Sequence, residues 1–254
     1  MGFPFKTGLK LFSTNTNLIA EALLLKDKYF NYVELYIIPG SYEKTISVWK
    51  ELDISFVIHA PHTVHGVNLA RSAFKATNIN RMREVQHFAD ELHADIVIVH
   101  GGNNGDINEA IEQLRIIDDD RIIVENKPKI GLLDERCIGW SLMEFNQLRK
   151  AGVLNGIALD FTHAICAARA TENDEWELIR SLMEFEPKIF HISDIDAFSH
   201  KDMHLNFGKG SLNLRQCFSF VPPDSLVTIE TPREDVGTLI DFVKDIKYLQ
   251  RILS

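Results

Sequence analysis

The chain has 254 residues, of which 45% are hydrophobic and 25% are charged, and its formal net charge is −9. These values are ordinary for a water-soluble globular protein, and no stretch approaches the roughly 20 apolar residues that a membrane-spanning helix requires. The negative charge disfavours general binding to nucleic acid, although a local basic patch or bound metal ions would reverse the field at one face.

Eight short apolar runs, typical of buried strands, follow one another along the chain. Each is apolar on both faces, as are the strands of a covered parallel sheet. They cover residues 9–13, 32–38, 54–60, 96–102, 121–126, 156–163, 188–194 and 226–232. Segments with helical spacing lie between them, for example at 17–30, 70–94, 141–152 and 174–185, and another at 235–253 follows the last run.

The alternation of strands and helices predicts one fold class above the others. Eight strand–helix units in about 250 residues is the size of a (β/α)₈ TIM barrel, so we predict a single barrel domain over residues 1–254. An open doubly wound sheet is the alternative, but no GxGxxG follows the first predicted strand, which weakens a dinucleotide fold.

The first residues and the cysteines favour a cytoplasmic protein. Residues 1–13 contain no basic stretch followed by a long apolar one, so we expect no secretory signal. Cys137, Cys166 and Cys217 are odd in number, far apart and in no CxxC pair, which argues against a disulfide framework and against a thiolate zinc site. We therefore expect a cytoplasmic protein with no membrane partner.

Side chains that can bind metals fall at the C-terminal ends of six of the eight predicted strands. In a barrel these positions converge on one mouth, where active sites lie. One polar residue at a strand end usually caps a loop, but so many after apolar runs would be costly to bury without a partner such as a cation. Imidazole and carboxylate ligands suit Zn²⁺, Mn²⁺ or Fe²⁺ at a catalytic site. The candidates are His59, His100, Glu125, Asp160, His163, His191 and Glu230 at strand ends, with Asp202 and His204 in the loop after the seventh strand.

Other polar and glycine residues near the predicted mouth have supporting roles. His62 follows His59 and is a candidate for contact with a substrate. Asp194 and His200 flank the loop after the seventh strand and could orient ligands from behind. Gly208 and Gly210, in GKG, are weak candidates for a backbone approach to phosphate, because a single GxG can also serve a tight turn.

Several short motifs, taken together, resemble endonuclease IV, the apurinic/apyrimidinic endonuclease family 2, within the class of xylose-isomerase-like TIM barrels. They are HAP at 59–61, HGG at 100–102, VEN at 124–126, LDFTHA at 159–164, FHISD at 190–194, DMH at 202–204 and IETP at 229–232. The resemblance implies up to three Zn²⁺ ions, a metal-bound hydroxide that cleaves a phosphodiester, and abasic-site duplex DNA as the partner, hence a role in DNA repair.

The same resemblance divides the candidate ligands among three metal ions, with Glu125 as a bridge between two of them. The implied sets are His59, His100 and Glu125; Glu125, Asp160, His191 and Glu230; and His163, Asp202 and His204.

Segments that the family uses to recognise DNA are changed in this chain. Endonuclease IV opens with GxHxS…GG and carries a basic residue after its second strand, whereas the stretches here are GLKLFSTNTNL and VELYIIPGSYEK. Thr63 and Val64 stand where the family inserts aromatic and apolar residues into DNA, and Met203 replaces the arginine of DRH. These changes bear on DNA recognition more than on metal binding.

Two alternatives therefore stay open beside the endonuclease. A sugar or sugar-phosphate isomerase or epimerase of the same fold would use one Mn²⁺ or Mg²⁺, with Glu125 and Glu230 as the acid and base. A phosphoesterase acting on a small phosphorylated substrate would keep the metal site and not bind DNA. The single-metal enzyme does not need His59, His100, Asp202 or His204.

Overall fold

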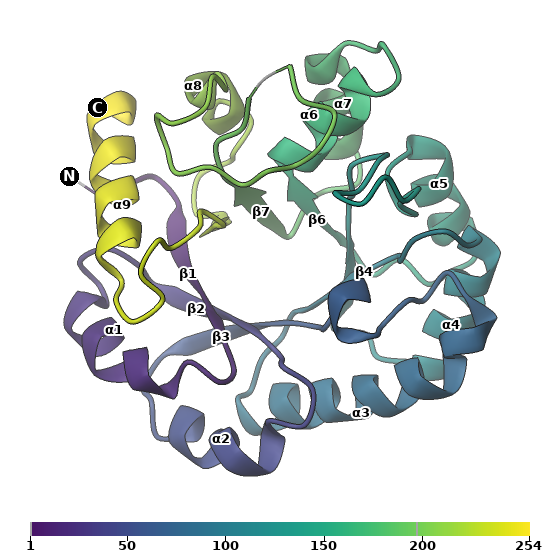
Figure 1. Ribbon diagram of the computed structural model, residues 1–254, viewed down its shortest axis with the longest axis horizontal. Coiled ribbons are helices and arrows are strands. Elements are labelled where there is room, and N and C mark those ends of the chain that lie inside the picture. The colour runs from purple at the N-terminus through teal and green to yellow at the C-terminus, as the bar shows by residue number, and fades with distance from the viewer. Residues whose placement is uncertain (1, 197) are drawn as a thin grey trace.

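Eight parallel strands form a closed barrel in chain order in the computed structural model, which describes residues 2–196 and 198–254 (Figure 1). The barrel closes where β8 pairs with β1. The predicted (β/α)₈ fold is confirmed. Seven predicted strands contain the observed one, whereas the first, 9–13, overlaps β1, which begins earlier, at Lys6. The strands are β1 (Lys6–Phe12), β2 (Tyr32–Tyr36), β3 (Ser55–His59), β4 (Val97–His100), β5 (Ile122–Glu125), β6 (Ile157–Asp160), β7 (Ile189–Ile192) and β8 (Leu226–Ile229).

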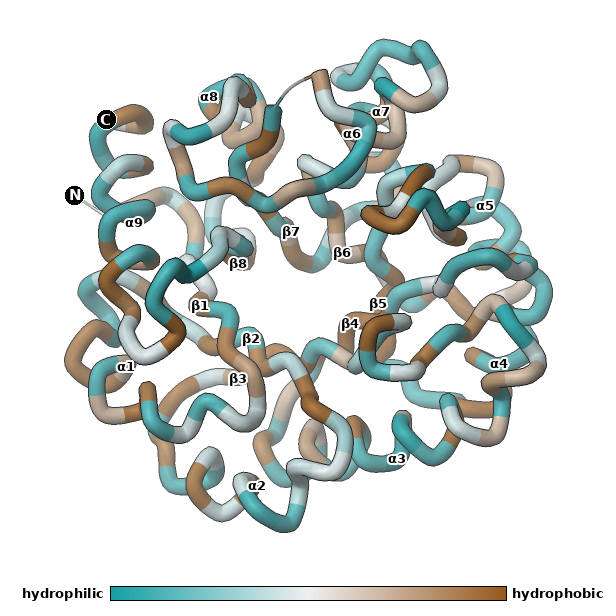
Figure 2. The backbone as a smooth tube through the Cα atoms, viewed as in Figure 1, coloured by the Kyte–Doolittle hydropathy of each residue, from teal (hydrophilic) through white to brown (hydrophobic). Residues whose placement is uncertain are grey.

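Helices follow the strands and surround the barrel as an outer ring (Figure 1). Hydrophilic and hydrophobic residues alternate along them, as expected for helices with one face on the barrel and one in water (Figure 2). The main helices are α1 (Ile19–Leu25), α2 (Tyr42–Lys50), α3 (Lys75–Glu91), α4 (Ile107–Ile117), α5 (Leu142–Lys150), α6 (Phe161–Arg169), α7 (Glu175–Met183), α8 (Leu214–Phe218) and α9 (Ile240–Leu253).

Among the described helices, none combines the length and the apolar character that crossing a membrane requires.

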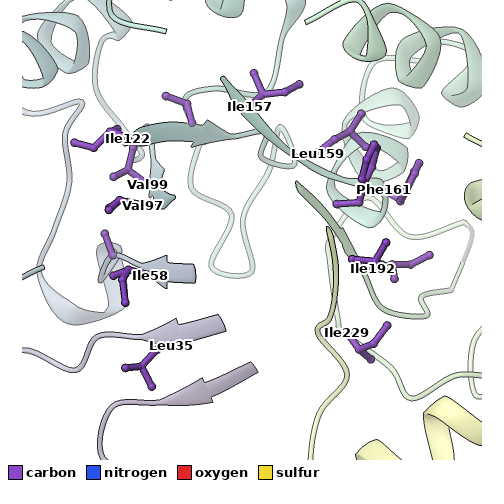
Figure 3. Packing of buried hydrophobic residues seen from close by; sticks show 14 of the residues in the cluster. Leu35, Ile58, Val97, Val99, Ile122, Ile157, Leu159, Phe161, Ile192 and Ile229 are labelled. Atoms are coloured by element: carbon purple, nitrogen blue, oxygen red, sulfur yellow. The ribbon is translucent and has the colours of Figure 1, made fainter. Parts of the chain in front are cut away.

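The larger part of the hydrophobic core lies between the strands and the helices. This one cluster includes residues from β2, β3, β4, β5 and β8, namely Leu35, Ile58, Val97, Ile122 and Ile229 (Figure 3). Because side chains alternate between the two faces of a strand, the residues next to them in sequence point into the barrel.

A second, smaller apolar cluster fills the inside of the barrel. It consists of one residue from each of six strands: Tyr32, Val57, Ile98, Ile123, Ala158 and Ile189. Gly8 on β1 makes room for it, because a Cβ atom at this position would collide with the ring of Tyr32. The cluster forms the apolar floor beneath the polar residues of the mouth.

Candidate metal centre

The inward position two residues after each floor residue carries a polar side chain. The alternation that turns Val57 and Ile98 inward therefore also turns His59 and His100 inward, one layer nearer the C-terminal mouth. Strand register places His100 beside Glu125 and Asp160 beside His191. The layer consists of Lys10, Glu34, His59, His100, Glu125, Asp160, His191 and Thr228, with Glu230 one residue beyond β8.

His59, His100 and Glu125, called the first group below, each offer a potential ligand atom within 4.8 Å of the others. The Nε2 atoms of the two histidines lie 3.1 and 2.9 Å from the same oxygen, Oε2 of Glu125. Nδ1 of His59 is 2.9 Å from the carbonyl oxygen of Ala60. Because a carbonyl only accepts, Nδ1 donates to Ala60, and with a metal ion in the group the Nε2 lone pair would be free to bind it. Burial and nearby Lys127 lower the pKa of His100 to about 3, so its imidazole is neutral at neutral pH.

Glu125, Asp160 and His191 form a second group with the same spacing. Oδ1 of Asp160 accepts hydrogen bonds from the Thr162 hydroxyl at 2.6 Å and the His163 amide at 2.7 Å. Its other oxygen, Oδ2, is buried and has no hydrogen-bond partner among the described residues. A buried carboxylate oxygen without a partner is costly, so this atom fits a bound cation.

Carboxylates surround both ring nitrogens of His191. Nδ1 lies 2.9 Å from Glu230 and 3.6 Å from Glu125, and Nε2 lies 2.8 Å from Glu34. Despite these separations, neither nitrogen makes a hydrogen bond of acceptable geometry within the described chain. Burial would lower the pKa of His191, but the carboxylates of Glu34 and Glu230 outweigh it and raise the pKa. Glu230 groups with Glu34 and His191, and His191 is shared with the group of Glu125 and Asp160, so the four-residue set that the resemblance implies stays a prediction.

His163, Asp202 and His204 form the third group. The Nε2 atoms of the histidines lie 3.1 and 2.6 Å from Oδ2 of Asp202. Their Nδ1 atoms lie 2.8 Å from the carbonyl oxygens of Asn126 and Glu230, which again assigns the hydrogen to Nδ1. Burial opposes protonation, but nearby carboxylates raise the pKa of His163 to about 10 and that of His204 to about 9. A proton and a metal ion would therefore compete for the same Nε2 atoms.

The position of His163 corrects the sequence analysis, which places it at the end of the sixth strand. Strand β6 ends at Asp160 and helix α6 begins at Phe161, so His163 lies in the first helical turn. The Asp160 side chain is the N-cap of this helix. The apolar run continues through Phe161, so hydropathy alone does not mark the boundary.

Two charged residues that the sequence analysis missed, Lys10 and Glu34, reach the centre from β1 and β2. The Lys10 ammonium forms an ion pair with Glu230 and lies 3.2 Å from Glu34, which also accepts a 2.6 Å hydrogen bond from Thr228. Burial would lower the pKa of Lys10, but the two carboxylates outweigh it and raise the pKa. Lys10 and Glu34 are each the only charged residue of their predicted strand. The position of each in the alternating pattern indicates that its side chain points into the barrel.

Lys127, in the loop after β5, was also missed. Its Nζ atom lies 3.2 Å from Nε2 of His163 and 3.7 Å from Oε1 of Glu125. A second ammonium group therefore contacts both the first and the third groups.

These groups open into a cavity of about 640 Å³ at the C-terminal mouth, a volume in the usual range for small-ligand sites. Lys10, Lys127 and members of the first and third groups line it. Its wall also includes the apolar side chains of Val64 and Leu133, which are 77% and 89% exposed. The cavity thus combines a charged interior with an apolar rim.

His62 lines the same cavity, as a substrate-contacting residue would. Its ring stacks on that of His100, with centroids 4.9 Å apart and planes 10° apart. Its backbone amide donates to the Tyr36 hydroxyl at 3.1 Å. Contact with a substrate stays a prediction for His62.

Gly208 and Gly210 have a different role from the predicted approach to phosphate. Their amides donate to Oδ2 of Asp194, at 2.8 and 3.1 Å. A Cβ atom on Gly210 would also collide with the Asp194 carboxylate. The two amides are already used inside the protein, so the substrate-binding interpretation is corrected to a structural one.

Asp194 and His200 differ in how they fit the predicted supporting role. The backbone of Asp194 pairs with Leu205, the residue after His204. Asp194 therefore fixes the loop of the third group without touching a candidate ligand. His200 is exposed, and its side chain makes no hydrogen bond or ion pair within residues 2–196 and 198–254, so the orienting role predicted for it has no structural support.

The donor atoms present fit a divalent metal ion. They are imidazole nitrogens and carboxylate oxygens, a set that suits Zn²⁺, Mn²⁺ or Fe²⁺, and the buried Oδ2 of Asp160 has no hydrogen-bond partner among the described residues and fits such an ion. Cys137 lines the cavity, but burial raises the pKa of its thiol to about 11, so it stays protonated. The structure therefore defines candidate metal sites without thiolate ligands.

Comparison with solved structures finds proteins of the same TIM-barrel fold. A D-tagatose 3-epimerase-like protein matches with a TM-score of 0.73 and 20% identity, over 98% of this chain and 97% of that one. Endonuclease IV from Thermus thermophilus matches with a TM-score of 0.73 and 17% identity, over 98% of both chains. A xylose isomerase domain protein from Planctomyces limnophilus matches with a TM-score of 0.65 and 13% identity, over 98% and 95%.

These neighbours include both an endonuclease and an epimerase-like protein, at identities that establish the fold alone. No family model matches the sequence, and no curated protein matches it. The fold and site together define a closed eight-stranded parallel barrel with candidate metal-binding clusters at its mouth.

Proposed function

We propose that the protein is a metal-dependent hydrolase that cleaves a phosphodiester, with abasic-site duplex DNA as the leading substrate. The assembly of the first and third groups carries this proposal. His59, His100, His163, Asp202 and His204 are the side chains that a single-metal isomerase does not need, yet they converge in two compact sets. Convergence of several sets supports a site with more than one metal, up to three, and the donor types suit zinc.

The residues of this chain would divide the work of such a site. Bound cations would supply Lewis acidity toward a phosphate group and lower the pKa of a water molecule. Glu125 belongs to the first group and lies 2.9 Å from His163 of the third, so it would couple the two. Lys127, in contact with Glu125 and His163, adds positive charge where a phosphate would approach.

Two features support a nucleic-acid substrate for this acidic chain. Metal ions and Lys127 would make the mouth locally positive, which permits phosphate binding despite the net charge of −9. The exposed side chain of Leu133 stands on the cavity rim, where an apolar group can fill the gap left by a missing base.

A sugar isomerase or epimerase is the second candidate, and the cavity favours it. About 640 Å³ suits a small molecule, and Glu125 and Glu230 both line the cavity from β5 and the end of β8. One of these carboxylates would remove a proton from the carbon beside a carbonyl and the other would return it.

Metal content and two activity assays test these candidates. The full-length protein is purified without added metal, and bound metals are measured by mass spectrometry. If the protein is the proposed hydrolase, we expect more than one tightly bound metal equivalent per chain. We also expect it to cleave a duplex that contains an abasic site and to leave an undamaged control duplex intact. A single exchangeable Mn²⁺ or Mg²⁺, with exchange of a ketose α-proton into deuterated solvent and an intact abasic duplex, would establish the isomerase instead.

A further inference from the structure

Arg233 brings a positive charge to the cavity without an internal counter-ion. It lies in the loop after β8 and lines the cavity. Nη2 donates to Oδ1 of Asn15 at 3.2 Å, whereas Nη1 is buried and has no hydrogen-bond partner within the described chain. No carboxylate lies within 4.0 Å of its guanidinium across residues 2–196 and 198–254. Burial lowers the pKa of Arg233, and no neighbouring carboxylate offsets this effect.

Two other partly buried arginines, Arg121 and Arg169, are paired with carboxylates. Arg121 reaches Asp90 and Asp119 at 2.7 and 2.8 Å, and Arg169 reaches Glu175 at 2.7 Å. Burying a charge is costly unless the charge is paired, so the unpaired state of Arg233 calls for a partner from outside the protein. A guanidinium fork matches phosphate and carboxylate oxygens.

Asn15 holds this guanidinium in place. The Oδ1 atom of Asn15 accepts hydrogen bonds from the Phe12 backbone amide, at 2.9 Å, and from Arg233. The backbone amide of Asn15 donates to the Phe12 carbonyl at 2.8 Å. The end of β1 therefore fixes Asn15, and Asn15 fixes one arm of the guanidinium. The other arm, Nη1, is buried and left without a partner among the described residues, so the guanidinium keeps hydrogen-bonding capacity that no group of the described chain satisfies.

We propose that Arg233 is an oxyanion-binding residue that recognises a phosphate or carboxylate group of the substrate at the β1 and β8 side of the mouth. The inference rests on the proposed function only in treating the cavity as a substrate site. It narrows the substrate to an anionic molecule and adds a specificity residue outside the predicted ligand set. A neutral sugar would leave Arg233 unpaired, so the isomerase candidate would require a sugar phosphate or sugar acid.

Inorganic phosphate is the probe for this proposal, titrated into the full-length protein by calorimetry before and after chelation of its metals. Arg233→Met is compared with wild type and with Arg136→Met, which removes the same charge from an exposed position after β5. We expect Arg233→Met to weaken phosphate binding about tenfold or more, because charge-assisted hydrogen bonds are lost. Arg136→Met should bind as wild type does.

Equal phosphate affinity in wild type and Arg233→Met, in both metal states, would overturn the proposal. Asn15→Ala is a second test in case Arg233→Met folds poorly, because it keeps the arginine charge and removes the hydrogen bond that positions it. Phosphate affinity equal to wild type in Asn15→Ala would contradict the positioning role of Asn15. An Arg233-dependent difference that survives chelation supports the proposal even if the protein proves not to be a hydrolase. Competition by ribose 5-phosphate, by acetate or by an abasic duplex then identifies the source of the oxyanion.

Discussion

The Asp160 carboxylate caps the helix that carries His163: its Oδ1 atom accepts the His163 amide at 2.7 Å while its Oδ2 atom is buried without a partner among the described residues. One side chain thus fixes a member of the third group and offers a free oxygen to the second. The placement of two candidate metal ions would depend on this single residue. Metal binding and the start of α6 are therefore expected to be coupled.

Substitution of Asp160 separates these two roles. Asp160→Asn keeps an oxygen that can accept the His163 amide but removes the charge, so it should lose metal while keeping the helix cap. Asp160→Ala loses both, and should be less stable than Asp160→Asn by about 1 kcal/mol. Urea unfolding of chelated samples measures the cap, and mass spectrometry measures the metal. Full metal content in Asp160→Asn would contradict the assignment.

His204 and His200 form a matched pair in one loop. His204 contacts Asp202 at 2.6 Å, whereas His200 is exposed. We expect His204→Ala to lose one metal equivalent and most cleavage of an abasic duplex, because the third group then has one imidazole left. His200→Ala should keep both. Retention of all metal and activity by His204→Ala would show that the third group is not used.

Lys10 is expected to stabilise the barrel by neutralising Glu34 and Glu230. Lys10→Met leaves these buried carboxylates short of a cation and should cost about 3 kcal/mol of unfolding free energy. Lys6→Met, an exposed position on the same strand, should change stability by less than about 0.5 kcal/mol. The double variant Lys10→Met, Glu34→Gln should recover part of the loss. Denaturant unfolding tests this cycle, and additive effects of the two substitutions would refute the coupling.

Chelation should destabilise the whole protein, because it leaves the clustered carboxylates of the second and third groups without cations. At a free metal concentration 100 times the dissociation constant, each site adds roughly 2.7 kcal/mol to the free energy of unfolding. We expect the thermal midpoint of the wild-type protein to fall on treatment with a chelator and to recover when zinc is returned. A midpoint that does not move would argue against tightly bound metal.

The barrel and most of its polar layer follow from sequence pattern. Apolar runs ending in His59, His100 and Glu125 mark both the strand and the point where it reaches the mouth. Because parallel strands of one barrel end at the same side, linear position converts directly into proximity. Lys10 and Glu34 belong to the same alternating pattern, but they lie inside β1 and β2 rather than at the ends of these strands. Candidates chosen only at strand ends therefore do not include them.

Other features depend on contacts that linear pattern does not contain. The roles of Gly208 and Gly210 follow from the placement of Asp194, fourteen and sixteen residues earlier in the chain. The pairing of Arg233 with Asn15 joins residues 218 positions apart. Likewise, the grouping of Glu230 with Glu34 requires the barrel to close between β8 and β1.

The carboxylate of Asp194 accepts the amides of Ile195, Gly208, Gly210 and Leu212. Together with the pairing between Asp194 and Leu205, this network closes the base of the long loop after β7, while Asp202 and His204 lie on its returning arm. We therefore expect residues near His200, on the outer part of the loop, to tolerate exchange or insertion without moving the third group. That outer part is a natural place to graft a different recognition segment, and related barrels could diverge in substrate there while their metal chemistry stayed the same.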